Sequence, residues 1–284
     1  MRILLKILDF LVVSNVYVAA GTFSLTWLSL QFYGNEKLDL AFFVFFSTLF
    51  AYNFMRLLRV QPMLKEGDSK RHQNIFRFRA FLWVLCICSA FAATMFFSRI
   101  YQQIFYTLIL MGLISVCYSL PVYKKGGYWL RLRDIPSIKI FLIAFVWAIV
   151  TSLMPMQVNE IAINWQQVFE RFLFVFAITI PFDIRDLRFD ASSLQTIPQV
   201  FGVQKARYIG VAFLLVAEGI LFYDYFFLDY YNLTSVLAIY FSYELAVLLV
   251  YKSDSSLSER YFTLCVEGTS IFVAVLFYLS QNIL

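Results

Sequence analysis

A series of long apolar runs, separated by polar segments, constrains the fold of this chain more than any other feature. The chain is 61% hydrophobic and only 14% charged, whereas soluble domains carry about 25% charged residues. Most of the runs approach the ~20 residues that an α-helix needs to cross ~30 Å of hydrocarbon. We therefore predict an all-α integral membrane protein with nine transmembrane helices in a single domain covering residues 1–284. The runs cover approximately 7–30, 38–58, 78–98, 100–120, 138–155, 167–182, 206–228, 232–251 and 261–283.

The distribution of basic residues predicts the orientation of these helices. If the N-terminus lies in the cytoplasm and the chain alternates sides, all but three of the 23 lysines and arginines fall on the cytoplasmic side. The exceptions are Lys37, Arg99 and Arg171. Such a bias is the positive-inside rule, so the net charge of +5 reflects topology and contact with anionic lipids, not nucleic-acid binding. Because no organelle transit signal is visible, we expect a bacterial inner (plasma) membrane.

Three aspartates follow the sixth apolar run and are the first candidates for chemistry. Asp183, Asp186 and Asp190 are spaced i, i+3 and i+7, so on a helix their carboxylates lie along one stripe. Grouped anions repel one another unless a cation, usually Mg²⁺, holds them together. The alternative is a solvated helix end in which Arg185 and Arg188 neutralise the aspartates. A metal site at the membrane edge would suit a molecule with a polar head and an apolar tail.

Two further segments carry polar groups at the ends of predicted helices. Asn53 and Arg56 are one turn apart at the end of the second run and share a helix face. Tyr118 ends the fourth run, and basic residues follow it. These residues serve either as membrane anchors or as partners for a diphosphate. The basic residues are Lys124, Lys125, Arg131, Arg133 and Lys139.

Three glutamates interrupt the last three apolar runs. Glu244 and Glu267 have no lysine or arginine within their own runs, and Glu218 shares its run only with Arg207 at the start of the run. Ionisable residues at membrane depth are costly and are functional candidates. They would line an acceptor pocket, form a proton or cation path, or stay protonated and bonded to neighbouring helices.

Taken together, these segments resemble the UbiA family of intramembrane prenyltransferases over nearly the whole chain. Asp183, Asp186 and Asp190 match the family's second acidic motif, and the segment 118–125 is similar to its YSxPxxKR-type stretch. The resemblance implies a UbiA-like bundle of nine helices. It also implies that the aspartates hold Mg²⁺ on the diphosphate of a polyprenyl donor while an aromatic or similarly electron-rich acceptor attacks the allylic carbon.

The chain departs from the family at the first acidic motif, NDxxDxxxD. Aligning the asparagine of that motif with Asn53 puts Phe54, Leu57 and Gln61 where the three aspartates belong. One explanation is an enzyme with a single metal site on the second motif, in which Arg56 neutralises the diphosphate directly. The other is a protein that has lost prenyl transfer.

We therefore predict Mg²⁺-dependent transfer of a prenyl group from a polyprenyl diphosphate to a lipophilic acceptor within the membrane. The alternatives are a non-catalytic isoprenoid-binding or scaffold protein of the same fold, and a proton or solute transporter that uses Glu218, Glu244 and Glu267. The predicted catalytic and metal-binding residues are Asp183, Asp186 and Asp190, and the predicted substrate-binding residues are Asn53, Arg56, Tyr118, Lys124 and Lys125. Membrane lipids are the other expected partners.

Overall fold

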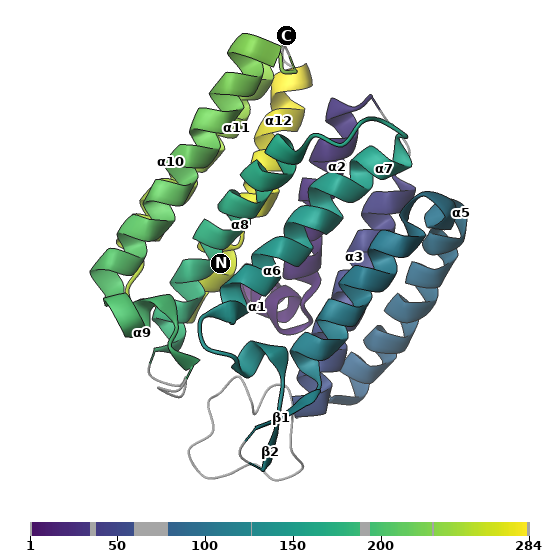
Figure 1. Cartoon of the computed structure of the whole chain (residues 1–284), viewed down its shortest axis with the longest axis vertical. Helices are drawn as coiled ribbons and strands as arrows, with labels where there is room; N and C mark the ends of the chain where they lie inside the picture. Colours follow the sequence, from purple (N-terminus) through teal and green to yellow (C-terminus); the bar gives the residue numbers. More distant parts are fainter. Residues whose placement is uncertain are drawn as a thin grey trace.

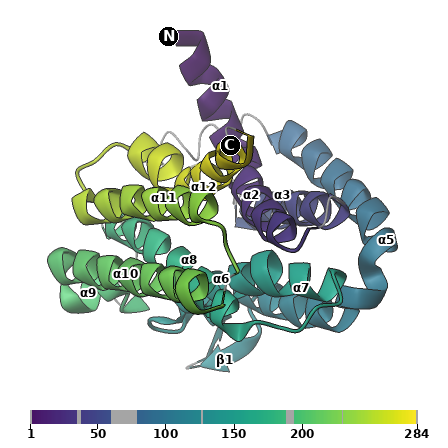
Figure 2. The same cartoon turned by 90° about the horizontal axis from the view of Figure 1, so that it is seen from above.

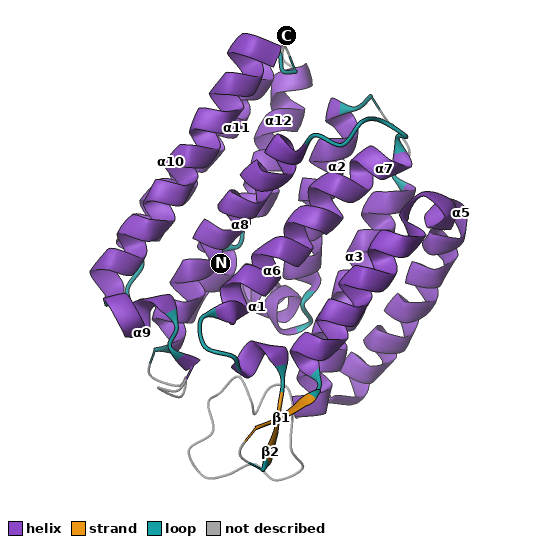
Figure 3. Ribbon diagram, in the orientation of Figure 1, coloured by secondary structure: helices purple, strands orange, loops and turns teal. Residues whose placement is uncertain are grey.

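The structure of the protein is a computed structural model that describes residues 2–34, 38–59, 79–125, 127–187, 194–228 and 230–282. The described part is helical almost throughout, with one small antiparallel hairpin in which Tyr123 pairs with Leu130 (Figure 3). The elements in chain order are α1 (Arg2–Val13), α2 (Val16–Phe32), α3 (Asp39–Arg59), α5 (Arg79–Ser119), β1 (Tyr123–Lys125), β2 (Tyr128–Leu130), the 3₁₀ turn η1 (Leu132–Asp134), α6 (Ile138–Ala148), the π-helical segment η2 (Ile149–Leu153), α7 (Met154–Val158), α8 (Trp165–Asp186), α9 (Ile197–Phe201), α10 (Val203–Leu228), α11 (Leu233–Lys252), the π-helical segment η4 (Tyr261–Val266) and α12 (Thr269–Asn282).

The long helices lie side by side as one bundle (Figure 1). The β1–β2 hairpin and α9 lie at one end of it, which we call the hairpin end, and the C-terminus lies at the opposite end. Helix α8 packs against α6, α10 and α11, while α3 packs against α2 and α5. The largest group of buried apolar side chains is centred on α8, α10 and α11, and a second group joins α2, α3, α5 and η2.

The structure confirms an all-helical membrane protein. By length and composition, seven helices of the described residues are suited to cross a membrane, and the bent pair α1–α2 gives an eighth. Two of the seven, Arg79–Ile100 and Gln102–Ser119, are the two arms of α5. The predicted span at 167–182 lies in α8, which is 22 residues long but too polar to be among them. The count of nine and the N-terminal orientation therefore stay predictions.

The polar side chains of α8 are directed at its neighbours. Arg171 is only 5% exposed, and one of its guanidinium nitrogens donates to the carbonyl of Leu25 on α2 at 3.1 Å. Gln166 donates to Asp224 on α10 at 2.8 Å, and the Tyr243 hydroxyl donates to Glu170. Because the surrounding helices satisfy most of these polar atoms, with Arg171 Nε as an exception, α8 is stable within the bundle although its composition is unfavourable in lipid.

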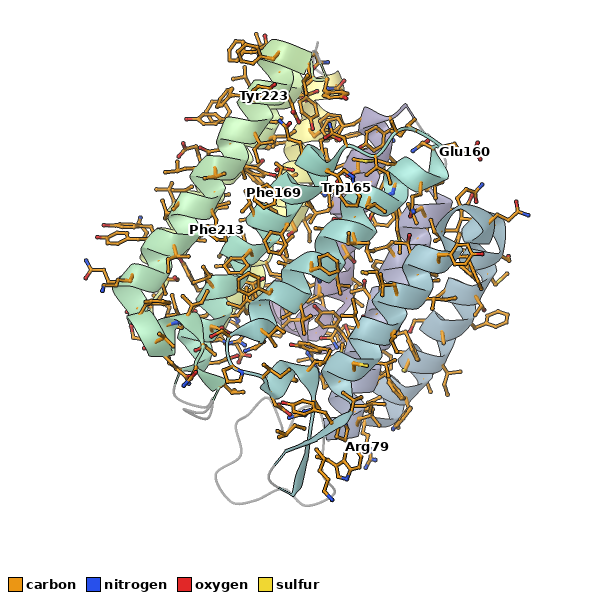
Figure 4. All side chains as sticks on the ribbon, viewed as in Figure 1. Arg79, Glu160, Trp165, Phe169, Phe213 and Tyr223 are labelled. Atoms are coloured by element: carbon orange, nitrogen blue, oxygen red, sulfur yellow. The ribbon has the colours of Figure 1, made fainter. Side chains whose placement is uncertain are left out.

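Large apolar and aromatic residues cover the outer surface of the bundle. Trp165, Phe169 and Tyr223 are 63%, 52% and 46% exposed, and Figure 4 shows Trp165 and Tyr223 toward the end away from the hairpin, with Arg79 at the hairpin end. Extensive apolar exposure would make a soluble protein associate. In a bilayer the same surface is stable, and tryptophan and tyrosine favour the membrane–water interfaces.

The first predicted span is broken in the structure. The run 7–30 predicts one helix, but α1 and α2 meet at 78°, and Figure 2 shows α1 projecting from the bundle. The break falls at Ser14 and Asn15, where Asn15 adopts the left-handed conformation with φ of 59°. Asparagine tolerates this conformation better than most residues. The break ends the regular hydrogen bonding of α1, so its last carbonyl groups need other partners.

The last helix is also interrupted. The π-helical segment η4 precedes Glu267 and Gly268, and regular α-helix resumes at Thr269. Glu267, which interrupts the predicted apolar run 261–283, lies at this junction. A Cβ added at Gly268 would lie 2.2 Å from the carbonyl oxygen of Leu264 and 2.5 Å from the hydroxyl of Tyr17. Glycine is therefore required for the close packing of α2 on the junction.

We expect Gly268→Ala to lower the thermal stability of the purified protein, because the added methyl group collides with backbone. Overpacking of this kind costs about 1–3 kcal/mol. Gly219→Ala is the matched control, since a Cβ at Gly219 on α10 meets nothing within 4 Å and alanine favours helix more than glycine does. Thermal unfolding in detergent measures both variants. Equal stability of Gly268→Ala and the wild type would contradict the packing described for this junction.

Candidate functional site

The hairpin end of α8 carries two of the three predicted metal-binding residues. Asp183 and Asp186 lie in the last turns of α8, one turn apart. Asp183 is only 2% exposed, and its Oδ1 accepts a hydrogen bond from Nζ of Lys139, in the first turn of α6, at 2.8 Å. A buried carboxylate is costly unless it is paired, so this contact between α6 and α8 is a structural requirement in the absence of ligand.

Asp186 has a basic partner of its own. The guanidinium group of Arg185 donates to both Asp186 oxygens, at 2.7 and 3.0 Å, and lies over the ring of Phe182 at 5.1 Å. Asp190 is outside the described residues. Within the described ranges, no three His, Cys, Asp or Glu side chains form a group able to hold a metal ion. The predicted three-aspartate metal site therefore stays a prediction.

A small recess lies beside Asp183. Its cavity volume is about 10 Å³, which is room for about one water molecule, so a larger ligand requires the lining side chains to move. Thr196 is only 4% exposed, and its hydroxyl has no hydrogen-bond partner. Two cations, a carboxylate and an unsatisfied hydroxyl therefore surround one hollow at the membrane edge. The lining residues are Arg133, Ser137, Lys139, Ile140, Asp183, Leu194, Thr196 and Ile197.

Arg133 reaches this recess because η1 holds it there. Asp134 in the same turn accepts hydrogen bonds from the backbone and guanidinium of Arg131 at 2.9–3.1 Å. Burial alone would raise the pKa of Asp134, but the hydrogen bonds from Arg131 outweigh it and the pKa lies below the usual value. An ionised Asp134 thus fixes η1. The guanidinium of Arg133 lies 5.4 Å from the ring centre of Tyr118, so the predicted residue Tyr118 adjoins a recess residue.

The other predicted basic residues lie on the hairpin. Lys124 is in the middle of β1, opposite Trp129 on β2, and its side chain is exposed. Lys125 ends β1, but its side chain is outside what the structure describes. Lys124 does not line the recess. Their predicted role in substrate binding is untested.

Asn53 and Arg56, which the sequence suggests as diphosphate ligands, contact the break between α1 and α2. The side-chain amide of Asn53 is fully buried; it donates to the Ser14 carbonyl at 2.9 Å and accepts from the Asn15 amide at 2.9 Å. Arg56 donates to the Val13 carbonyl and to Asn15 Oδ1. These bonds satisfy the carbonyl groups that the break leaves open, which is essential at membrane depth. Both residues therefore have a structural role here, and their role as ligands stays a prediction.

The positions that replace the first acidic motif are occupied by packing residues. Leu57 is 2% exposed and contacts Leu82 and Cys86 on α5. Phe54 packs on the same small cluster. Gln61 is outside the described residues. Phe54 and Leu57 therefore supply no carboxylate, whereas α8 supplies Asp183 and Asp186.

Three polar recess residues were not singled out as site residues from the sequence. Arg133 and Lys139 stand out only as two of five basic residues after Tyr118, and Thr196 carries no sequence signal. Lys139 does have one distinguishing feature, because it lies inside the apolar run that begins at Ile138. A lysine placed there needs an acidic partner, and Asp183 is that partner.

The three intramembrane glutamates do not come together as a metal-binding group among the residues described. Glu218 on α10 interacts electrostatically with Glu244 on α11, which is hydrogen-bonded to Tyr240. Glu218 is 6% exposed, and its Oε1 has no hydrogen-bond partner. Glu267 instead interacts with Arg185 at the end of α8. The predicted role of these glutamates in transport is untested.

Comparison with solved structures identifies the fold. A UbiA homologue from Archaeoglobus fulgidus bound to GPP and Mg²⁺ is similar with a TM-score of 0.61 and 14% sequence identity, over 95% of this chain and 96% of that one. A UbiA homologue from the same organism bound to DMAPP and Mg²⁺ gives a TM-score of 0.53 and 15% identity, over 99% of this chain and 98% of that one. A structure of a UbiA homologue from that organism bound to Cd²⁺ gives 0.59 and 16%, over 95% and 99%.

No family model matches the sequence, and no curated protein matches it. The structural similarity nevertheless extends over nearly the whole chain, and it confirms the UbiA-like membrane fold that the motifs around Tyr118 and Asp183 predict. The chain has the fold of the UbiA homologues.

Proposed function

We propose that the protein transfers a prenyl group from a prenyl diphosphate to a lipophilic acceptor at the hairpin end of α8. The observation that carries this proposal is the recess in which Asp183 lies with Lys139 and Arg133. GPP and DMAPP, which the archaeal homologues of the same fold bind together with Mg²⁺, are prenyl diphosphates. A diphosphate needs cations around it, and its apolar tail needs a membrane.

The residues at the end of α8 fit a magnesium ion that arrives with the diphosphate. Mg²⁺ is usually held by one or two carboxylates together with substrate phosphates and water, not by a complete cage of protein ligands. Asp183 and Asp186 supply two carboxylates one turn apart, and Asp190 is the predicted third. When bound, the metal would stabilise negative charge on the departing diphosphate.

The side chains of the recess would complete the donor site. Lys139 would move from Asp183 to a phosphate oxygen as the metal neutralises the aspartate, and Arg133 would bind the phosphate with its fixed fork of donors. The Thr196 hydroxyl, which has no partner, would donate to an oxygen of the diphosphate. Such donors stabilise charge as it develops in the transition state.

In the transfer step the allylic carbon–oxygen bond breaks and its electron pair stays on the diphosphate. An electron pair of the acceptor forms the new bond to the allylic carbon, and the acceptor then loses a proton to the released diphosphate or to water. We propose an aromatic or similarly electron-rich acceptor and a bacterial inner membrane as the location.

Binding of labelled GPP to the purified protein, with Mg²⁺ and after its removal by a chelator, tests this function. We expect binding and turnover to need the metal, and Asp183→Asn/Asp186→Asn to lower turnover by about 10²–10³-fold, as loss of transition-state charge stabilisation does. Asp39→Asn is the control, since it removes a carboxylate from the exposed pair with Arg99. If binding and turnover of GPP did not depend on Mg²⁺, and the double variant matched the wild type in both, the proposed prenyl transfer would be ruled out.

A second candidate is a non-catalytic isoprenoid-binding protein. The apolar packing of Phe54 and Leu57 at first-motif positions favours it, because a UbiA-type enzyme has carboxylates there. This candidate predicts saturable binding of GPP without release of diphosphate in the presence of any acceptor. Release of diphosphate would exclude it.

A further inference from the structure

An open groove lies between the start of α10 and the end of α11, at the hairpin end of the bundle (Figure 1). Its volume is about 430 Å³, within the ~300–1,000 Å³ that small-molecule sites occupy. None of its lining residues lines the recess around Asp183, so it is a separate feature of the same end. The polar and aromatic residues that line it are Gln204, Arg207, Tyr208, Tyr251, Lys252 and Asp254.

Arg207 is held in a fixed position in this groove. Its Nε donates to the Ser253 carbonyl at 2.5 Å, and its Nη2 donates to Oδ2 of Asp254 at 2.8 Å. Asp254 is fixed in turn, because the backbone N–H and the hydroxyl of Ser256 donate to its Oδ1 at 3.0 and 2.7 Å. These bonds hold the pKa of Asp254 below its usual value, so the carboxylate is charged. The remaining nitrogen of Arg207, Nη1, donates to no residue that the structure describes.

Lys252 gives the groove a net positive charge. It is the last residue of α11, and its side chain is exposed and makes no hydrogen bond or ion pair with the residues described. Because Arg207 and Asp254 neutralise one another, one positive charge remains, and a phosphodiester carries one negative charge. Lys205 on α10 is also exposed, but it does not line the groove.

Two tyrosines place the groove at the membrane–water interface. Tyr208 on α10 and Tyr251 on α11 stack with ring centres 6.4 Å apart and planes at 26°, and both rings are exposed. Gln204 donates to the Tyr208 hydroxyl at 3.1 Å. Tyrosine favours the level of the lipid headgroups. Since α10 and α11 are both long and apolar enough to cross a membrane, the groove lies where two spans end.

The apolar surface next to the tyrosines continues toward the middle of the bundle. Leu215 follows Tyr208 by seven residues on α10, and Leu248 precedes Tyr251 by three on α11. These spacings put each leucine on the same helix face as its tyrosine, and both leucines are exposed. A lipid with its phosphate in the groove would therefore lay its acyl chains over an apolar surface.

We propose that the groove between α10 and α11 binds the headgroup of an anionic phospholipid, with Arg207 and Lys252 donating to its phosphate. The inference does not depend on the proposed prenyl transfer. Guanidinium and ammonium groups both bind phosphate, and basic residues near the membrane surface attract anionic lipids. A zwitterionic lipid brings an ammonium group that Lys252 repels. A soluble phosphate ester meets the same cations but gains nothing from the apolar surface.

Native mass spectrometry of the full chain in detergent, titrated with phosphatidylglycerol or phosphatidylcholine of identical acyl chains, tests this proposal. We expect the first phosphatidylglycerol to bind about tenfold more tightly than the first phosphatidylcholine. Lys252→Met should weaken phosphatidylglycerol binding about fivefold, the loss expected for one basic residue at the membrane surface, and Lys252→Arg should retain it. Lys205→Met removes an exposed lysine outside the groove and should leave the affinity unchanged.

Three results would each overturn the proposal. The first is equal affinity of the wild type for the two lipids, which needs no variant. The second is an equal loss in Lys252→Met and Lys205→Met, which would show that anionic lipid is attracted by overall charge and not by the groove. The third is displacement of phosphatidylglycerol by glycerol phosphate at an equal concentration, which would identify a site for soluble phosphate esters. Because Lys252 is exposed, its substitution should leave the melting temperature unchanged, and this is measured on the same samples.

Discussion

Lys139→Met is expected to destabilise the protein by up to about 3–5 kcal/mol, because it removes the Lys139 ammonium from the buried Asp183 carboxylate. Asp183 is 2% exposed and Lys139 contacts it at 2.8 Å. The double variant Lys139→Met/Asp183→Asn should recover most of the lost stability, since no unpaired charge remains. Thermal or denaturant unfolding in detergent measures the three proteins, and binding of labelled GPP is measured on the same samples.

The stability and the binding results should diverge in this series. We expect the double variant to be stable and yet unable to bind GPP, because both charges of the proposed donor site are gone. Lys205→Met, at an exposed position of α10, is the control for loss of one positive charge and should change neither quantity appreciably. Full GPP affinity in the restored double variant would show that the recess does not bind the diphosphate.

Arg56→Met and Asn53→Leu are expected to cost about 2–5 kcal/mol each while leaving GPP affinity close to that of the wild type. Each removes the partners of two polar groups at the α1–α2 break, and an unsatisfied buried group costs about 1–3 kcal/mol. For Asn53 these groups are the Ser14 carbonyl and the Asn15 amide. Unfolding in detergent gives the stability, and titration with labelled GPP gives the affinity.

Arg99→Met is the control for Arg56→Met. Arg99 forms an exposed pair with Asp39 at 2.8 Å, and such pairs contribute at most about 1 kcal/mol. The opposite pattern, in which Arg56→Met keeps its stability but loses GPP affinity, would support the sequence-based role of Arg56 as a diphosphate ligand and contradict the structural role.

The membrane-spanning architecture is predictable from the sequence because hydrophobic length is a local property. A helix needs about twenty apolar residues to cross the membrane, whatever its neighbours are. The run 206–228 meets this requirement, and α10 covers it. The break between α1 and α2 is not local. It requires Asn53 to satisfy the Ser14 carbonyl across 39 residues of sequence, so the polar pair Ser14–Asn15 alone gives little indication of a bend.

The candidate site also has local features that the sequence predicts and contacts between distant residues that it does not. The spacing of Asp183 and Asp186 correctly puts both on the last turns of one helix. Which of the five basic residues lies beside them depends on how α6 packs on α8, because Lys139 and Asp183 are 44 residues apart. Thr196 reaches the recess only because the chain returns there before α9. Pairing across elements of this kind is set by tertiary packing, which spacing along the sequence does not encode.

The polarity of α8 also has a consequence for how the protein is made. A charged residue disfavours insertion of a helix into the membrane, by roughly 2.5–3.5 kcal/mol at the centre and less toward the ends, and α8 carries the adjacent pair Glu170 and Arg171 as well as Asp183. The groups that satisfy these residues belong to other helices: Tyr243 on α11 for Glu170, and the carbonyl of Leu25 on α2 for Arg171. Helix α8 therefore needs neighbouring helices in order to insert stably into the bilayer. During synthesis, α8 stays in the bilayer only if it packs against helices made before it, such as α2 and α6. Its insertion becomes stable once α10 and α11 have also been synthesised.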